Sequence, residues 1–143
     1  MERIVITQGP EETEELGAGL APRLTDGDVV ALVGELGAGK TTFVKGLARG
    51  LFVKDEILSP SFLLARTHPG RLPFHHLDAY RIAAARELSE VGLLGLLPPE
   101  EGVTAVEWAD RIPGLIPPGA IWVVLELAGG DRRKITLRRQ QPV

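Results

Sequence analysis

Cysteine and asparagine are both absent from this sequence. Without cysteine, the chain can form no disulfide, no thiolate metal site and no cysteine nucleophile. Long apolar runs are also missing, since no segment approaches the roughly 20 apolar residues that a membrane-spanning helix needs. The charged N-terminus is unlike a secretory signal. These absences predict a soluble protein of the cytoplasm.

A large excess of either charge is lacking as well. The 16 basic and 19 acidic side chains leave a formal net charge of −3, which gives no general reason for tight binding to nucleic acid. Hydrophobic residues account for 44% of the 143 positions, which is enough for one globular core. We therefore expect a single domain that spans residues 1–143.

Strand-like and helix-like segments alternate along the first half of the chain. Residues 3–7 predict a short strand, and residues 11–24 carry leucines at helical spacing, with Pro22 expected to kink or end that helix. Residues 29–33 are apolar without alternation, which is typical of a strand buried on both faces. A helix is expected over residues 40–51.

The second half of the chain is richer in strands. Its predicted elements are a hairpin of residues 61–67 and 72–77, a helix over 83–92, a strand over 102–108, and a hairpin of 120–128 and 132–139. Strands interleaved with helices favour an α/β fold. The two hairpins make the expected sheet mixed, with helices flanking it.

A glycine-rich loop joins the buried strand to the helix that follows. Residues 34–41, GELGAGKT, fit the pattern G-x-x-x-x-G-K-[ST], whose backbone N–H groups and helix N-terminus bind phosphate. Lys40 is expected to reach the β- and γ-phosphates, and the Thr41 hydroxyl to bind Mg²⁺. The predicted nucleotide-binding residues are Glu35, Leu36, Gly37, Ala38, Gly39, Lys40, Thr41 and Thr42. The expected fold is therefore P-loop NTPase-like.

Acidic residues follow two later strands, where an open α/β sheet collects its ligands. Asp78 either holds Mg²⁺, directly or through water, or caps the next helix. Glu107 is either a second metal ligand or a residue that orients the attacking water. The neighbouring Trp108 is expected in the core, because most tryptophans are largely buried. His75 and His76 are expected to be structural, since they have no further metal ligands beside them.

The class of P-loop protein is narrowed by motifs that are missing. A regulatory GTPase needs Asn-Lys-x-Asp and Asp-x-x-Gly, and this chain has no asparagine and no aspartate with glycine at the third following position. The GTPase interpretation is therefore rejected. A small-molecule kinase with an unidentified acceptor remains an alternative, because acceptor sites have no universal motif.

Four segments in order resemble the TsaE (YjeE) family of bacterial P-loop ATPases: GELGAGKTTFVKGLARGL, SPSF, HHLDAYRI and VEWAD. The resemblance implies an ATP-binding and ATP-hydrolysing subunit that supports TsaB and TsaD in forming threonylcarbamoyladenosine beside the tRNA anticodon. It implies an Mg²⁺-dependent ATPase that is slow alone and modulated by its partners. Contact with tRNA is expected only through the complex, and no membrane is involved.

The same resemblance suggests roles for individual residues. Lys40, Asp78, Glu107 and Trp108 fall on catalytic positions, so that Trp108 is moved from the core to the site. Thr41, Glu107 and Asp78 fall on metal positions, with Glu107 favoured as the direct ligand and Asp78 as a residue behind it or one that positions water.

Three further segments are singled out by the resemblance or by their charge. Ser59 and Ser61 fall on a switch loop, where Ser61 replaces the usual threonine, and residues 9–11 and 129–131 are expected beside the nucleotide. Residues 132–139, RRKITLRR, are interpreted as an edge strand whose charges prevent pairing with other chains or are simply solvated. The alternative is a basic contact to TsaD or tRNA.

Overall fold

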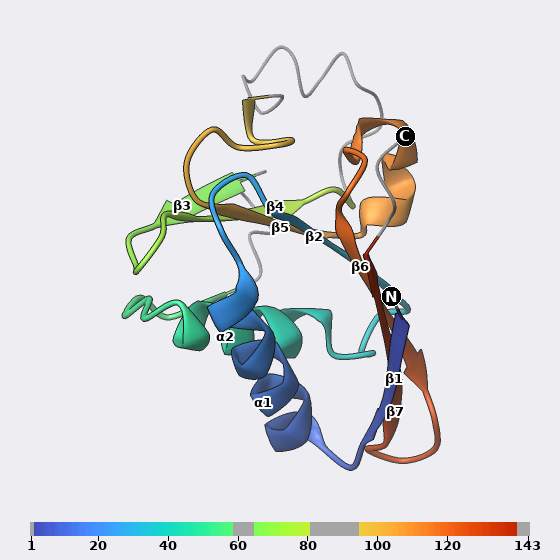
Figure 1. Cartoon of the computed structure of the whole chain (residues 1–143). Coiled ribbons are helices and arrows are strands. Elements are labelled where there is room, and N and C mark those ends of the chain that lie inside the picture. The colour runs from blue at the N-terminus through green and yellow to red at the C-terminus, as the bar shows by residue number, and fades with distance from the viewer. Residues whose placement is uncertain (1, 59–64, 81–94, 140–143) are drawn as a thin grey trace.

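A seven-stranded sheet runs through the computed structural model, which describes residues 2–58, 65–80 and 95–139 (Figure 1). Its strands lie in the order β1 (Glu2–Thr7), β7 (Arg133–Arg139), β6 (Ile121–Leu127), β2 (Val29–Gly34), β5 (Val103–Glu107), β4 (Phe74–Asp78) and β3 (Ala65–His68). Strands β6, β2, β5 and β4 are parallel, whereas β1, β7 and β3 pair antiparallel to their neighbours. The predicted mixed sheet is confirmed, including both hairpins where the chain is described.

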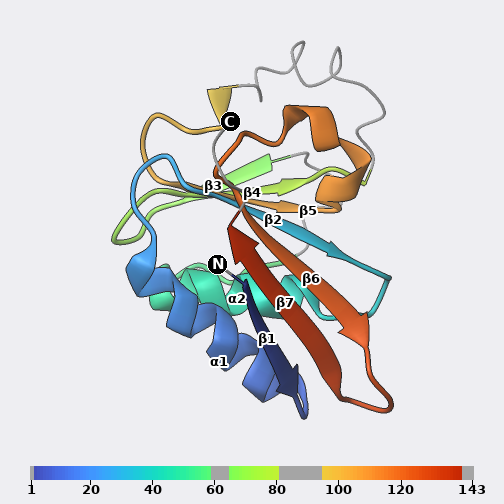
Figure 2. The ribbon, with the colours of Figure 1, turned by 45° about the vertical axis from the view of Figure 1, so that its right-hand side comes forward.

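Helices α1 (Pro10–Leu20) and α2 (Lys40–Gly50) lie side by side on one face of the sheet (Figure 2). After Leu20 the chain continues as the 3₁₀ turn η1 (Ala21–Arg23), because Pro22 has no N–H to extend the α-helical bonding. The opposite face carries the 3₁₀ turns η3 (Ala109–Arg111) and η4 (Pro113–Leu115). Within the described ranges, no helix is long and apolar enough to cross a membrane. The helix predicted over 83–92 lies outside those ranges.

Strand β2 separates two apolar clusters. Val30 and Leu32 belong to the cluster that α2 covers, whereas Val29 and Ala31 belong to the cluster on the opposite face. Successive side chains of a strand point to opposite faces, so a strand covered on both sides needs apolar residues throughout. The predicted two-sided burial of this strand is confirmed.

The two helices touch through glycines. A Cβ atom added to Gly17 of α1 would lie 2.3 Å from the carbonyl oxygen of Phe43, and one added to Gly46 of α2 would lie 2.0 Å from that of Glu14. Neither distance is compatible with a side chain, because the helix backbones themselves are in contact. Helix α1 is therefore held against α2.

The arginine-rich strand β7 is an inner strand. It lies between β6 and β1, and β1 forms that edge of the sheet. The interpretation of residues 132–139 as a charge-protected edge strand is therefore wrong. The N-terminal strand pairs with the C-terminal one, and this distant pairing leaves no local pattern in either segment.

Candidate functional site

The glycine-rich loop connects the end of β2 to the first residue of α2. Gly37 and Gly39 have φ angles of 82° and 102°, in the left-handed region that favours glycine. The loop places the N-terminus of an 11-residue helix at the opening of the site, where its free N–H groups and positive dipole end attract anions. The geometry is that of a phosphate-binding loop.

Lys40 is buried at the base of this loop. Its Nζ donates hydrogen bonds to the carbonyl oxygens of Gly34, at 2.6 Å, and Glu35, at 3.0 Å. The same nitrogen lies 3.7 Å from the ring centroid of Trp108. Burial lowers the pKa of Lys40 below its ordinary value of 10.5, against the opposing effect of nearby carboxylates, of which Glu107 is the strongest. The ammonium group therefore lacks full solvation, and a phosphate oxygen could complete its contacts.

Thr41 and Glu107 meet across the site. The Thr41 hydroxyl lies 2.9 Å and 3.1 Å from the two carboxylate oxygens of Glu107. Glu107 is buried at the end of β5, next to β2 in the parallel sheet, so the strand pairing carries it to the first turn of α2. The hydroxyl and the carboxylate predicted as metal ligands are therefore in direct contact.

The His76 side chain contacts the carboxylate of Glu107. Its Nε2 lies 2.6 Å from Glu107 Oε2, and its side chain is fully buried. Sequence reasoning assigned no role in the site to this histidine. A usable signal was present, because His76 and Asp78 are two residues apart on one strand and so share a face, and Asp78 lies opposite Glu107 in the register.

His75 points the other way and has structural partners. Its Nδ1 lies 2.9 Å from the Thr67 hydroxyl, and its Nε2 lies 2.9 Å from the carbonyl oxygen of Glu101. Among the described residues, no cluster of three or more histidine, cysteine or acidic side chains is placed to hold a metal ion.

Asp78 and Trp108 lie at the ends of β4 and β5. Asp78 is nearly buried, and its Oδ1 accepts a hydrogen bond of 2.9 Å from the backbone N–H of Tyr80. Trp108 is half-buried and adopts a left-handed φ of 61°, and its ring packs edge-on against that of Tyr80 at 4.9 Å. Trp108 thus packs partly against the core and also contacts Lys40.

A cavity of about 220 Å³ adjoins the loop. It is lined by Pro10, Thr13, Gly37, Ala38, Gly39, Thr42, Asp131 and Arg133. Arg133 also donates a hydrogen bond of 3.1 Å to the carbonyl oxygen of Gly37. The fold therefore brings the segments 9–11 and 129–131, expected beside the nucleotide, to the same side of the loop.

The remaining predicted residues lie on the loop surface or are not described. Glu35 and Leu36 are exposed at the loop tip, and only the backbone carbonyl of Glu35 contacts Lys40. Ser59 and Ser61 lie outside the described residues.

Comparison with known proteins gives the family. A sequence model of the family described as "Threonylcarbamoyl adenosine biosynthesis protein TsaE" matches residues 7–135. The chain belongs to the TsaE family. The tRNA threonylcarbamoyladenosine biosynthesis protein TsaE of Treponema pallidum is 35% identical over 132 residues, covering 92% of this chain and 97% of the relative. The TsaE of Bacillus subtilis is 40% identical over 131 residues, covering 91% and 81%.

A solved structure has a similar fold. The crystal structure of Bacillus subtilis YdiB matches with a TM-score of 0.79 at 33% identity, covering 98% of this chain and 86% of the YdiB chain. Membership of the TsaE family gives the chain a role in tRNA threonylcarbamoyladenosine biosynthesis. The P-loop fold implies that it binds a nucleotide.

Proposed function

We propose that this protein binds and hydrolyses ATP as the ATPase subunit that acts with TsaB and TsaD in forming threonylcarbamoyladenosine in tRNA. The observation that carries the proposal is the contact between Thr41 and Glu107, at 2.9 Å. It joins the first turn of the phosphate-binding helix to an acidic strand end, which is the arrangement that nucleotide hydrolysis needs. Contact with tRNA is made through the complex.

Lys40 and the loop backbone bind the phosphates in this proposal. The Lys40 ammonium exchanges the carbonyl oxygens of Gly34 and Glu35 for oxygens of the β- and γ-phosphates. Trp108 limits how far the ammonium can move, since it lies 3.7 Å from the ring and a cation is attracted to an aromatic face. The lysine therefore stays at the loop in both states.

The donor set fits Mg²⁺. This ion prefers oxygen ligands and binds through one or two protein groups together with substrate phosphates and water, so no larger acidic cluster is needed. Thr41 and Glu107 would hold it, and the charge supplied by the bound ion offsets that of the phosphates. His76 keeps the Glu107 carboxylate oriented, and Asp78, at the neighbouring strand end, positions the attacking water.

The cavity beside the loop takes the rest of the nucleotide. Thr13 and Thr42 line it from the two helices, and Asp131 and Arg133 line it from the C-terminal hairpin. The cavity adjoins the glycine-rich loop, so a nucleotide whose phosphates are bound by the loop extends into it. The nucleoside of ATP is of suitable size and polarity.

The test is phosphate release from ATP and Mg²⁺, by the protein alone and with TsaB and TsaD. We expect slow release that the partners change, and a loss of about 100-fold or more in Lys40→Ala and Glu107→Gln, because each variant removes a group that stabilises the reacting phosphate. Lys45→Ala is the matched control, since Lys45 is exposed on the same helix. A rate of phosphate release that TsaB and TsaD do not change, or one that requires a small hydroxylated acceptor, would instead favour a small-molecule kinase.

A further inference from the structure

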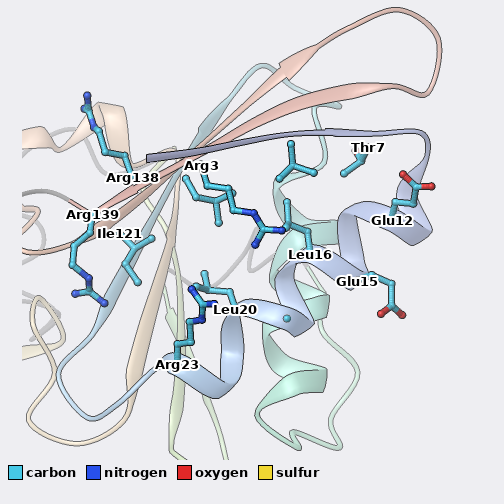
Figure 3. Close-up of a pocket in the computed structure, with 13 residues that line it drawn as sticks. Arg3, Thr7, Glu12, Glu15, Leu16, Leu20, Arg23, Ile121, Arg138 and Arg139 are labelled. Atoms are coloured by element: carbon cyan, nitrogen blue, oxygen red, sulfur yellow. The ribbon is translucent and has the colours of Figure 1, made fainter. Parts of the chain in front are cut away.

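A second, larger groove lies away from the phosphate-binding loop. It has a volume of about 430 Å³ and runs between α1 and the sheet on the side of β1 (Figure 3). Its apolar lining is formed by Val5, Leu16, Leu20, Ile121 and Leu137. No residue of the glycine-rich loop lines it, so the groove is separate from the candidate phosphate-binding site.

The groove is open because of how α1 is packed. The contact through Gly17 and Gly46 holds α1 against α2, and the other side of α1 is left without an equally close neighbour. Leu16 and Leu20 pack on the core but remain only half-buried. Apolar surface of this kind favours a ligand that removes it from water.

Charge is unequally distributed along the groove. Arg23, Arg138 and Arg139 lie toward one end, with Arg3 between them and Leu16, and Glu12 and Glu15 lie toward the other end (Figure 3). The acidic end is already satisfied, because Glu12 accepts a hydrogen bond of 2.8 Å from the backbone N–H of Gln8 and Glu15 accepts one of 2.9 Å from Arg49.

The basic end of the groove has arginine side chains whose N–H donors are unpaired in the ranges that the structure describes. Arg3 and Arg23 are exposed, and neither makes a hydrogen bond or an ion pair within the described part of the chain. Arg139 is already engaged, since it donates to the carbonyl oxygen of Gly119 and lies 3.5 Å from Asp28. Arg138 also lines the groove and is exposed without such a partner among the described residues. The free guanidinium groups therefore call for an anionic group on the occupant.

Strand β1, which forms one wall, is also the edge of the sheet. Its backbone pairs with β7 on one side. On the other side, its N–H and C=O groups have no backbone partner among the described residues. The strand contains no proline or lysine that would prevent pairing. An extended segment can add to such an edge, and its alternate side chains then enter the groove on one face.

We propose that the groove between α1 and β1 is a docking site for an extended segment of a partner protein. The segment carries apolar side chains at alternate positions, which cover Leu16 and Leu20, and acidic side chains at the end that meets Arg3 and Arg23. It pairs with the backbone of β1. The site does not depend on ATP hydrolysis by this chain.

The chemistry of the groove favours a peptide over the other candidates. A nucleic acid would also meet the arginines, but no aromatic side chain lines the groove to stack on a base. A second copy adding its own β1 would bring exposed Ile4 and Ile6 but only Glu2 as an acid. A segment with both apolar and acidic side chains complements the apolar lining of the groove and also its free arginines.

The experiment uses the full chain and fluorescein-labelled peptides of sequence DDVTVTV and its reverse, VTVTVDD, to cover both strand directions. Binding is followed by fluorescence anisotropy. We expect one direction to bind, and at least tenfold weaker binding to the Arg3→Ser/Arg23→Ser variant. Replacing the two aspartates of the peptide by lysine should have a similar effect. Arg66→Ser is the matched control, because Arg66 is exposed on β3 at the far edge of the sheet.

Folding of each variant is checked by its thermal unfolding midpoint, which should equal that of the unaltered protein. The proposal is overturned if neither peptide binds, or if the arginine variant binds both peptides as well as the control does. It is also overturned if a single-stranded RNA oligonucleotide, in place of the peptides, binds in a way that depends on Arg3 and Arg23. Self-association that the arginine variant abolishes, without peptide binding, would assign the groove to a second copy of this chain.

Discussion

The ammonium group of Lys40 lies between two carbonyl oxygens and the ring of Trp108, largely out of water. Burial lowers its pKa, so the folded protein holds this charge less readily than the unfolded chain does. A buried cation without a phosphate beside it therefore reduces the free energy of unfolding. At the scale of single residues, the buried charge of Lys40 favours anion binding but lowers the stability of the nucleotide-free protein.

We expect Lys40→Met to raise the free energy of unfolding of the nucleotide-free protein, by about 0.5–2 kcal/mol. The gain should depend on pH. Between the lowered pKa and 10.5, the unfolded chain holds more protons at Lys40 than the folded one, so the stability of the unaltered protein rises with pH there. The advantage of the variant is therefore largest below the lowered pKa and shrinks toward pH 10.5.

Urea unfolding of both proteins across the alkaline range measures this difference. Lys45→Met serves as the control, because Lys45 is exposed on the same helix, and its effect should stay within about 0.5 kcal/mol. A stability gap that does not narrow as the pH rises would refute the explanation from burial of the charge.

Some residues of the site were predictable from the sequence because their chemistry is tied to a motif or to a strand end. The contact between Thr41 and Glu107 follows from such positions. The role of His76 follows only in part: its two-residue spacing from Asp78 places both side chains on one face of β4, but which carboxylate it contacts is set by the pairing of β4 with β5. The contact of Trp108 with Lys40 could not be predicted from the sequence, since it depends on a left-handed turn after β5.

At the scale of elements, the contact between α1 and α2 fixes much of the molecule. It holds α1 against α2, which packs on the sheet, and leaves the groove beside β1 open. The close approach of the two backbones requires glycine at positions 17 and 46. Glycine otherwise weakens a helix, so these residues are explained by packing between helices and not by the local preference of either helix.

Gly46→Ala should therefore destabilise the protein although alanine favours the helix. The new Cβ would lie 2.0 Å from the carbonyl oxygen of Glu14, and overpacking of this kind lowers the free energy of unfolding by about 1–3 kcal/mol. Gly19→Ala is the matched control on α1, because its Cβ would meet nothing within 4 Å. We expect that variant to be more stable by about 0.5–1 kcal/mol. Urea unfolding that moved both variants in the same direction would contradict the packing argument.

The helices and strands themselves were largely predictable from the sequence, whereas the pairing of the strands was not. Strand β2 and helix α2 follow from a continuous apolar run and a glycine-rich loop, both of which are local patterns. The position of β7 between β6 and β1 depends on pairing between the two ends of the chain. Local patterns give each strand its buried face but do not specify which strand it pairs with.

At the scale of the whole molecule, the cavity beside the glycine-rich loop and the groove share helix α1, which lines both. Thr13 of α1 lines the cavity, and Thr7 of β1 lines the groove. Their hydroxyl groups form a buried hydrogen bond of 2.8 Å. This bond connects the edge strand to the helix that lines the cavity beside the glycine-rich loop, so its loss should affect both the cavity and the groove.

We expect Thr13→Val to lower the free energy of unfolding by about 1–3 kcal/mol, because the buried Thr7 hydroxyl loses its partner. The double variant Thr7→Val/Thr13→Val should recover most of this loss, since neither polar group is then left unpaired in the core. Urea unfolding of the two single variants and the double variant gives the coupling between the residues directly. Losses that simply added would show that each threonine acts through its own surroundings, and the edge strand and the cavity would then be joined by backbone pairing alone.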